Sequence, residues 1–150
     1  MTADLDSRVR LHIYRSFVDC GTPPTTEETA SALSLPEPET ADAYRRLAEA
    51  HAIVLEPGST DVWMANPLSA RPTSFQVEVS DGRTWHGVCA WDAPGVLAMV
   101  GSDGVVRSSC PDCRDPLELI VEKGEMRGPE GAVAHFLVPA KHFWEDIGFT

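Results

Sequence analysis

Hydrophobic residues recur at helical spacing near the start of the chain. Val9, Ile13 and Phe17 are each four residues apart, and Cys20 continues the same apolar stripe. Gly21 then supplies a C-terminal cap, so we expect the first helix to end there. Because a free cysteine is among the most buried residue types, Cys20 is expected to pack in the core or at the interface between the lobes rather than to react.

Two further helices and a hairpin are predicted before residue 69. Thr25 and Glu28 have the spacing of a capping box, which opens a short helix that ends near Leu33. A third helix presents four apolar residues on one face: Ala43, Tyr44, Leu47 and Ala50. Residues 53–55 and 62–65 flank a Pro-Gly turn and predict two paired strands. Three helices followed by a hairpin is the order of elements in a winged helix.

The hydrophobic pattern changes to a period of two after a proline-containing linker at residues 66–72. Alternation at residues 75–79, an Asp-Gly turn and the returning segment 83–88 predict a hairpin that leads to Cys89. A short helix is expected at residues 96–100. Further strands are expected at residues 105–106, 117–121 and 132–138, followed by a helix or extended arm at residues 141–147.

These elements predict an α+β fold in two parts. Residues 1–69 are expected to form a winged-helix-like lobe of three helices and a hairpin. Residues 70–150 are expected to form a mostly antiparallel β-rich lobe with short helices, which carries Cys89 and Asp92. A chain of 150 residues buries enough surface to fold without disulfides or a structural metal.

The chain is acidic, with 12 lysines and arginines against 23 aspartates and glutamates and a net charge of −11. Such a surface repels phosphate backbones and anionic lipids, so neither nucleic acid nor a membrane is an expected partner. The predicted recognition helix carries only Arg45 and Arg46 against four acidic residues. No apolar stretch approaches the ~20 residues of a membrane span, and the N-terminus lacks the features of a secretory signal. We therefore expect a cytoplasmic protein whose cysteines meet a reducing environment.

Cys89 is the strongest candidate for a reactive group. It follows a predicted strand, precedes Asp92 by three residues, and stands before the Pro-Gly at 94–95 that is expected to end the strand. If the Asp92 side chain folds back over the turn, a soft nucleophile and a proton donor lie side by side. A structural cysteine is the alternative, and the flanking Trp85 and Trp91 are expected to pack in the core.

Cys110 and Cys113 form a single C-x-x-C motif. Two such motifs indicate a zinc site, whereas one leaves further ligands to be found, for which Cys89, His86 and His135 are the candidates. The predicted flanking strands disfavour a redox motif, which normally lies at a helix N-terminus. The alternative is a turn whose two thiols are incidental.

Taken together, these residues resemble the organomercurial (alkylmercury) lyase family. Residues 89–92 match its C-A-x-D motif, and the Ser-Ser-Cys at 108–110 follows at a similar distance. The resemblance extends through residues 116–119 and the Val-Pro at 138–139, and it includes the N-terminal lobe, so most of the chain takes part. The family's second catalytic cysteine follows a stretch resembling residues 143–150, and this sequence ends at or just before that position.

The resemblance implies protonolysis of a carbon–mercury bond, which gives a hydrocarbon and Hg(II) without an organic cofactor. Cys89 corresponds to the thiolate that captures mercury, and Asp92 to the carboxyl group that relays the proton and contacts the metal. Cys110 corresponds to a structural cysteine, and Cys113 is the candidate for the second thiol. The implied partners are an organomercurial substrate and cellular thiols, with Hg(II) as the bound product. Soft thiolates are the ligands that suit such a metal.

Two other functions remain open. The same scaffold would also suit a protein that holds Hg(II) or Zn(II) through Cys89, Cys110 and Cys113 without cleaving a bond. A metal-responsive regulator that uses the winged helix is the third reading, which the acidic charge disfavours.

Overall fold

Three helices form the N-terminal part of the protein. The structure is a computed structural model, and it describes residues 2–149. The helices are α1 (Thr2–Cys20), α2 (Thr26–Leu33) and α3 (Glu37–Glu49). The predicted capping box is confirmed: Thr25 Oγ1 accepts a hydrogen bond from the Glu28 N–H at 3.1 Å, and Glu28 Oε2 accepts one from the Thr25 N–H at 2.7 Å. None of the helices in this described range is both long and apolar enough to cross a membrane.

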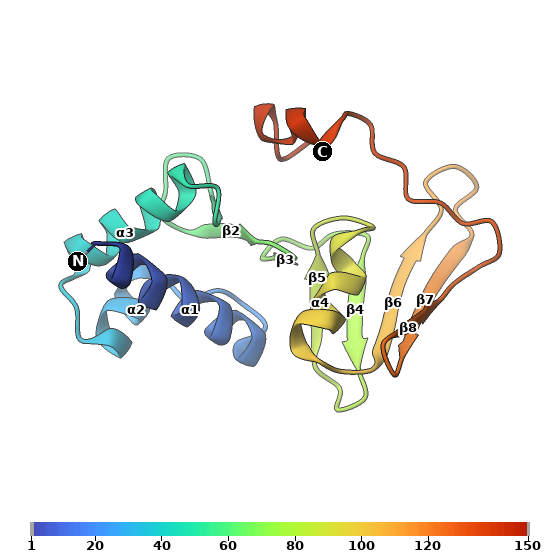
Figure 1. The fold of residues 1–150 in the computed structure, drawn as a ribbon, viewed down its shortest axis with the longest axis horizontal. Helices are drawn as coiled ribbons and strands as arrows, with labels where there is room; N and C mark the ends of the chain where they lie inside the picture. Colours follow the sequence, from blue (N-terminus) through green and yellow to red (C-terminus); the bar gives the residue numbers. More distant parts are fainter. Residues whose placement is uncertain (1, 150) are drawn as a thin grey trace.

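Within residues 2–149, an antiparallel sheet of eight strands has the order β1-β2-β3-β5-β4-β6-β7-β8. Its strands are β1 (Val54–Leu55), β2 (Val62–Ala65), β3 (Leu68–Ser69), β4 (Gln76–Val79), β5 (Thr84–Gly87), β6 (Gly104–Ser109), β7 (Pro116–Glu122) and β8 (Glu125–Arg127). Figure 1 shows α1, α2 and α3 at one end and β6, β7 and β8 at the other, with β3 between them. Helices followed by an antiparallel sheet confirm the α+β fold.

Strand β3 lies within the segment that the sequence predicts as a linker. Leu68 pairs with Ala65 of β2 on one side and with Gly87 of β5 on the other. The N-terminal hairpin and the C-terminal strands therefore belong to the same sheet. A strand of two residues is too short to show a period of two in the sequence. The division into lobes at residues 69 and 70 stays a prediction.

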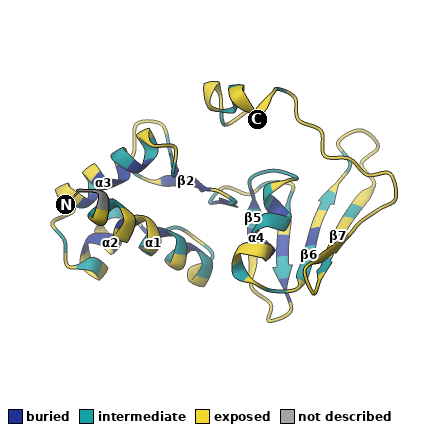
Figure 2. Cartoon of the chain, viewed as in Figure 1, coloured by how far each residue is buried: buried dark blue, intermediate teal, exposed yellow. Residues whose placement is uncertain are grey.

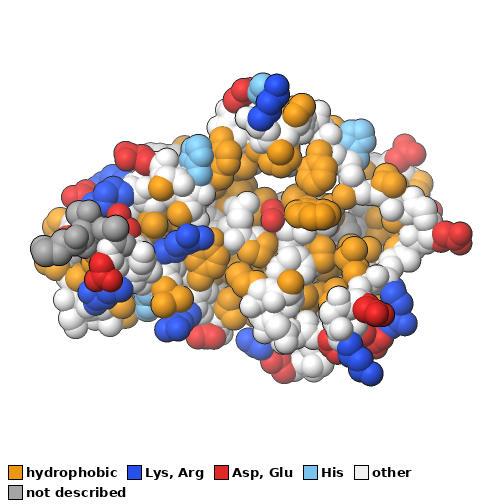
Figure 3. Space-filling model, viewed as in Figure 1, with side chains coloured by type: hydrophobic (Ala, Val, Ile, Leu, Met, Phe, Trp, Pro, Cys, Tyr) orange, Lys and Arg blue, Asp and Glu red, His pale blue; other side chains and the backbone are white. Residues whose placement is uncertain are grey.

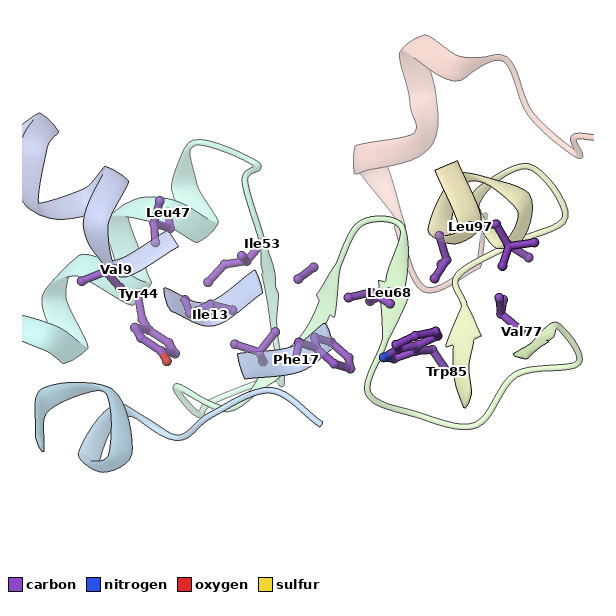
Figure 4. Close-up of a cluster of buried hydrophobic side chains, with 14 of the residues drawn as sticks. Val9, Ile13, Phe17, Tyr44, Leu47, Ile53, Leu68, Val77, Trp85 and Leu97 are labelled. Atoms are coloured by element: carbon purple, nitrogen blue, oxygen red, sulfur yellow. The ribbon is translucent and has the colours of Figure 1, made fainter. Parts of the chain in front are cut away.

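The hydrophobic core runs from the N-terminal helices to α4 (Asp92–Val100), which packs against β4 and β5. Trp85 of β5 connects the two ends: its side chain is buried, and its Nε1 donates a hydrogen bond to the Val18 carbonyl of α1 at 3.2 Å. Figure 4 shows Phe17, Leu68 and Trp85 following one another along this core. The core therefore holds α4, and the turn before it, in a fixed position on the sheet.

The chain leaves the sheet after β8 and continues as an exposed arm. The predicted strand at residues 132–138 is wrong, because this stretch is coil that lies beyond the edge strand β8. Alternating hydrophobicity alone does not supply a neighbouring strand with which to pair. The arm then forms the 3-10 helix η1 (Ala140–Glu145), in which the Trp144 ring stacks on His51 at 3.9 Å. Figure 2 shows that most of this arm is exposed.

Two side chains expected in the core are exposed. Cys20 is exposed because it is the last residue of α1, and the buried face of that helix ends at Phe17. Trp91 is 71% exposed, since it caps the N-terminus of α4 where the chain turns at the surface. The matching expectation for Trp85 is confirmed, with an exposed fraction of 3%.

Candidate functional site

Sheet topology brings Cys89 and Cys110 to the same edge of the sheet. Strands β5 and β6 both pair antiparallel with β4, so they run in the same direction and end on the same side. Cys89 follows the end of β5 at Gly87, and Cys110 follows the end of β6 at Ser109. Strand ends that lead into loops are common positions for reactive side chains. The strand order that creates this adjacency cannot be deduced from the sequence pattern.

A short turn carries the chain from β5 into α4. The Cys89 carbonyl accepts a hydrogen bond from the Ala93 N–H at 3.0 Å, and Asp92 is the first residue of the helix. The Val88 N–H donates to the Pro67 carbonyl at 3.1 Å, which ties the turn to the connection between β2 and β3. This turn places the Cys89 and Asp92 side chains next to each other.

The Cys89 thiol is hydrogen bonded to the Asp92 carboxylate. The sulfur lies 3.4 Å from Asp92 Oδ2, with the S–H group as donor. This is the approach that the sequence predicts for an aspartate that folds back over the turn. Cys89 is half-buried, so its side chain is partly shielded and partly accessible to solvent.

Partial burial favours the neutral form of each group. Burial is the largest cause that raises the pKa of Cys89 above its ordinary value of 9.0, and the Asp92 charge also raises it, against backbone hydrogen bonds from Asp92 and Trp91. Burial likewise raises the pKa of Asp92 above 3.8, although the hydrogen bond from Cys89 lowers it. A carboxyl group with a raised pKa is suited to hold and deliver a proton.

The histidines considered as further metal ligands lie elsewhere. His86 is on β5, and its Nδ1 accepts a hydrogen bond from the Thr73 N–H at 3.3 Å. His135 is in the exposed coil after β8. Across residues 2–149, no group of three or more His, Cys, Asp and Glu side chains is placed to hold a metal ion. The described residues therefore do not form a four-ligand zinc site around the C-x-x-C motif.

Cys110 and Cys113 lie in the turn between β6 and β7. The Cys110 N–H donates to the Asp115 carbonyl at 2.9 Å, and the Arg114 N–H donates to the Cys110 carbonyl at 3.0 Å, so the turn is closed on both sides. The two thiols are not joined in a disulfide. Backbone hydrogen bonds from Cys113 and Asp112 lower the pKa of Cys110.

The pKa of Cys113, the second thiol of this turn, is shifted in the opposite direction. The backbone hydrogen bond from Asp115 lowers the pKa of Cys113, but its side-chain hydrogen bonds with Asp115 and Cys110 raise it above the ordinary value of 9.0.

Ser108 is a candidate that sequence reasoning missed. Its Oγ is buried and has no hydrogen-bond partner within the described part of the chain. Ser108 is two residues from Val106 on β6, so both side chains point to the same face of the sheet. Val106 is opposite Val77, which is opposite Trp85, and these three buried residues belong to the core shared with α4. A serine within a strand gives no sign in the sequence that its hydroxyl is unpaired.

Two hollows elsewhere on the surface lack the reactive side chains that are found at the sheet edge. A hollow of about 300 Å³ is lined by Ser7, Arg10, Leu11 and Tyr14. Another, of about 590 Å³, is lined by Arg45, Gly58, Ser59 and Thr60. Neither lining contains a thiol or a carboxylate. Figure 3 shows hydrophobic side chains gathered across the middle of the face in view, around α4 and below the C-terminal arm.

The family profile of alkylmercury lyase, MerB, matches residues 68–150. The match covers more than half of the chain. The chain belongs to the alkylmercury lyase family. The family predicted from the sequence is thereby confirmed, and the matched segment includes Cys89, Asp92 and the C-x-x-C turn of Cys110 and Cys113.

A solved member with a similar fold is known. The crystal structure of the mercury-bound form of MerB2 aligns with a TM-score of 0.63 and 21% sequence identity, over 79% of this chain and 58% of that chain. At this identity the likeness shows the α+β fold alone. This chain spans less than two thirds of the length of the MerB2 chain to which it is compared. No curated protein matches the sequence.

Proposed function

We propose that this alkylmercury lyase family protein cleaves the carbon–mercury bond of organomercurials, with Cys89 as the capturing thiol and Asp92 as the proton carrier. The observation that supports the proposal is the hydrogen bond of 3.4 Å between Cys89 Sγ and Asp92 Oδ2. It joins a soft metal ligand to a proton acceptor inside the segment that matches the family.

Capture begins with a proton transfer within this pair. A raised pKa keeps the Cys89 thiol protonated near neutral pH, so it must lose its proton to bind mercury. Asp92 accepts that proton along the existing hydrogen bond, and a sulfur–mercury bond forms as the S–H bond breaks. Because Asp92 is partly buried, the resulting carboxylic acid is stabilised relative to one in water.

Cleavage returns the same proton. The Asp92 carboxyl group protonates the carbon bound to mercury, so a carbon–hydrogen bond forms with the electron pair of the breaking carbon–mercury bond. The hydrocarbon leaves, Asp92 becomes a carboxylate again, and Hg(II) stays on the Cys89 sulfur. No electron is gained or lost overall, so the step calls for no organic cofactor.

Product release completes the cycle. Cellular thiols are soft ligands that can exchange onto Hg(II) and free Cys89, which is half-buried and accessible. The net charge of −11 suits a cationic organomercurial or Hg(II) more than an anionic ligand. We infer that the protein acts among the reduced thiols of the cytoplasm.

Turnover with phenylmercury tests the proposal. The purified chain is incubated with phenylmercury and excess 2-mercaptoethanol, and benzene release and mercury bound per chain are both measured. We expect many turnovers for the unmodified chain and none for Cys89→Ser. Cys20→Ser is the matched control, because Cys20 is an exposed thiol outside the site and its loss should leave turnover unchanged. Full turnover in Cys89→Ser would refute the assignment.

Asp92→Asn separates capture from cleavage. The amide keeps the shape of the side chain but does not accept or deliver the proton. We expect this variant to bind mercury more slowly, because the Cys89 proton must then pass to buffer, but still to full occupancy. We expect benzene release to be at least about 100-fold slower, as for the loss of a general acid. Unchanged benzene release would exclude Asp92 as the proton carrier.

Mercury binding without cleavage is the second candidate function. Its support is that, within the described residues, no second thiol joins Cys89 and Asp92 in a larger group of metal ligands. A single thiolate captures an organomercurial but gives the metal less electron density than two do. In the same experiment, stoichiometric mercury uptake without benzene would favour this function over the lyase.

A further inference from the structure

We propose that Cys110 and Cys113 form a second mercury site, in which one Hg(II) ion is held between the two thiolates. The pair is separate from Cys89 and Asp92 and lies in the turn between β6 and β7. It requires neither Cys89 nor bond cleavage, because both ligands come from the same turn. The choice of Hg(II) as the ion rests on the proposed function of the family-matched site.

The turn already holds the two cysteines close together. Cys110 and Cys113 are three residues apart in the closed turn between β6 and β7, and they are not joined in a disulfide. Hydrogen bonds of 2.9 Å between Cys110 N and Asp115 O, and of 3.0 Å between Arg114 N and Cys110 O, fix the backbone around them. Little conformational entropy is therefore lost when both sulfurs ligate one ion.

The number of ligands selects the class of metal. Zinc in a structural site takes four ligands in a tetrahedron, and the described residues supply no third or fourth to this pair. Hg(II) is a soft ion that is stable with two thiolates in a nearly linear arrangement. Binding of Hg(II) involves no oxidation or reduction, because two S–Hg bonds form as two S–H bonds break and release their protons.

Access and charge agree with a captured cation. Cys113 is exposed, and Cys110 is only half-buried, so solvent reaches the pair. Asp112 and Asp115 belong to the same turn. These acidic groups raise the local concentration of cations.

The position of the turn connects it to the first site. Arg107 of β6 and His86 of β5 are both opposite Gln76 of β4. Strand β5 ends at Gly87 and β6 ends at Ser109, so the two strands end within one residue of the same level. Two strand spacings separate those ends, which is about 10 Å. Hg(II) that leaves Cys89 would therefore meet the Cys110–Cys113 pair at the same edge of the sheet.

The test uses the full chain with the double substitution Cys20→Ser and Cys89→Ser, which leaves only the proposed pair of thiols. HgCl₂ is added with excess 2-mercaptoethanol, the protein is desalted, and mercury per chain is measured. We expect one bound Hg(II), with two sulfur neighbours by X-ray absorption. Adding Cys110→Ser or Cys113→Ser should weaken the retention of Hg(II) by about 10²–10⁴-fold, because the second sulfur ligand must then come from a separate thiol molecule in solution.

Several outcomes would overturn the site. Retention equal to that of a chain with all four cysteines replaced would show that the pair does not hold mercury. Retention that survives loss of either Cys110 or Cys113 would show that the two thiols do not act together. Binding of Cu(I) but not Hg(II) would refute the choice of metal. Because Cys89 is absent from the tested chain, none of these results depends on whether the lyase reaction occurs.

Discussion

Gly87 touches the first turn of α4 at Ala93 so closely that no side chain fits between them. A Cβ atom on Gly87 would lie 2.5 Å from Ala93 Cα and 2.6 Å from Ala93 Cβ. The helix therefore rests directly on the end of β5, and the intervening turn of residues 88–91 is short. This contact sets the distance between Cys89, which lies in that turn, and Asp92, which directly follows it.

Replacement of Gly87 by alanine should move α4 and impair the site. The added methyl group meets backbone atoms, which cannot rotate away, so we expect a loss of about 1–3 kcal/mol in the free energy of unfolding. A displacement of about 1 Å at Cys89 and Asp92 should lower turnover of phenylmercury by about 10²-fold. Urea unfolding and benzene release measure the two effects.

Gly95→Ala is the matched control within the same helix. Its Cβ would lie 3.7 Å from Pro67 Cβ, which is an ordinary contact, and alanine is favoured over glycine inside a helix. We expect stability to rise by about 0.5–1 kcal/mol with turnover unchanged. Equal loss of turnover in both variants would mean that the contact at Gly87 does not set the geometry of the site.

The raised pKa of Asp92 predicts how stability depends on pH. Burial raises the folded-state pKa above 3.8, so the neutral carboxyl group stabilises the fold at low pH. That contribution is complete below pH 3.8 and is lost as pH rises through the folded-state value. Asp92→Asn does not titrate at this position. We therefore expect the stability of the variant, relative to that of the unmodified chain, to increase as the pH rises from 3 to 7.

Asp81→Asn should show the opposite dependence. The backbone N–H of Arg83 lowers the pKa of Asp81, so its carboxylate stabilises the fold above the unfolded-state value and that stability is lost as pH falls through the folded-state value. The stability of Asp81→Asn, relative to that of the unmodified chain, should therefore decrease as the pH rises from 3 to 7. Urea unfolding at several pH values measures the stability of each variant relative to the unmodified chain. If this relative stability changed with pH in the same direction for Asp92→Asn and Asp81→Asn, the opposite pKa shifts of the two aspartates would be contradicted.

The contact between Cys89 and Asp92 was within reach of the sequence because it is local. The two residues are three positions apart, and a turn between a strand and a helix brings such side chains together. The capping box of Thr25 and Glu28 could be predicted for the same reason. The Cys89–Asp92 contact and the capping box both depend on a few consecutive residues and on the backbone conformations that those residues prefer.

Contacts between distant residues could not be predicted in the same way. That Cys110 shares a sheet edge with Cys89 depends on β4 lying between β5 and β6, and the pattern of alternating residues is the same for any strand order. The core position predicted for Trp91 failed because hydrophobicity does not show that the residue caps a helix at the surface. The short strand β3 was hidden among prolines that normally indicate a linker.

The pairing of the two arginines on α3 predicts that the chain does not bind DNA. Arg45 lies 2.6 Å from Asp42, and Arg46 lies 2.6 Å from Asp6 of α1, where it forms two parallel hydrogen bonds. Phosphate contacts would have to displace these carboxylates against a net charge of −11. We expect no retardation of duplex DNA in a gel at low salt, where electrostatic binding is strongest. A shift that disappears with added salt would contradict this expectation and revive the regulator as a function.

The unpaired hydroxyl group of Ser108 predicts a stabilising substitution. A buried polar atom without a partner costs about 1–3 kcal/mol, so Ser108→Ala should raise the free energy of unfolding by up to about 1 kcal/mol after the small loss of packing. Ser69→Ala is the matched control, because Ser69 is also buried but its Oγ donates to the Arg71 carbonyl at 2.8 Å. That variant should lose about 1 kcal/mol.

Comparing the two serine variants also tests whether Ser108 meets the substrate. Ser108 lies one residue before the end of β6, on the face of the sheet against which α4 packs. If the hydroxyl group has no role in binding, Ser108→Ala should keep the KM for phenylmercury while it stabilises the fold. A gain in stability together with a raised KM would instead mean that the site retains an unpaired hydroxyl because a ligand uses it. A loss of stability similar to that of Ser69→Ala would show that Ser108 is hydrogen bonded in solution.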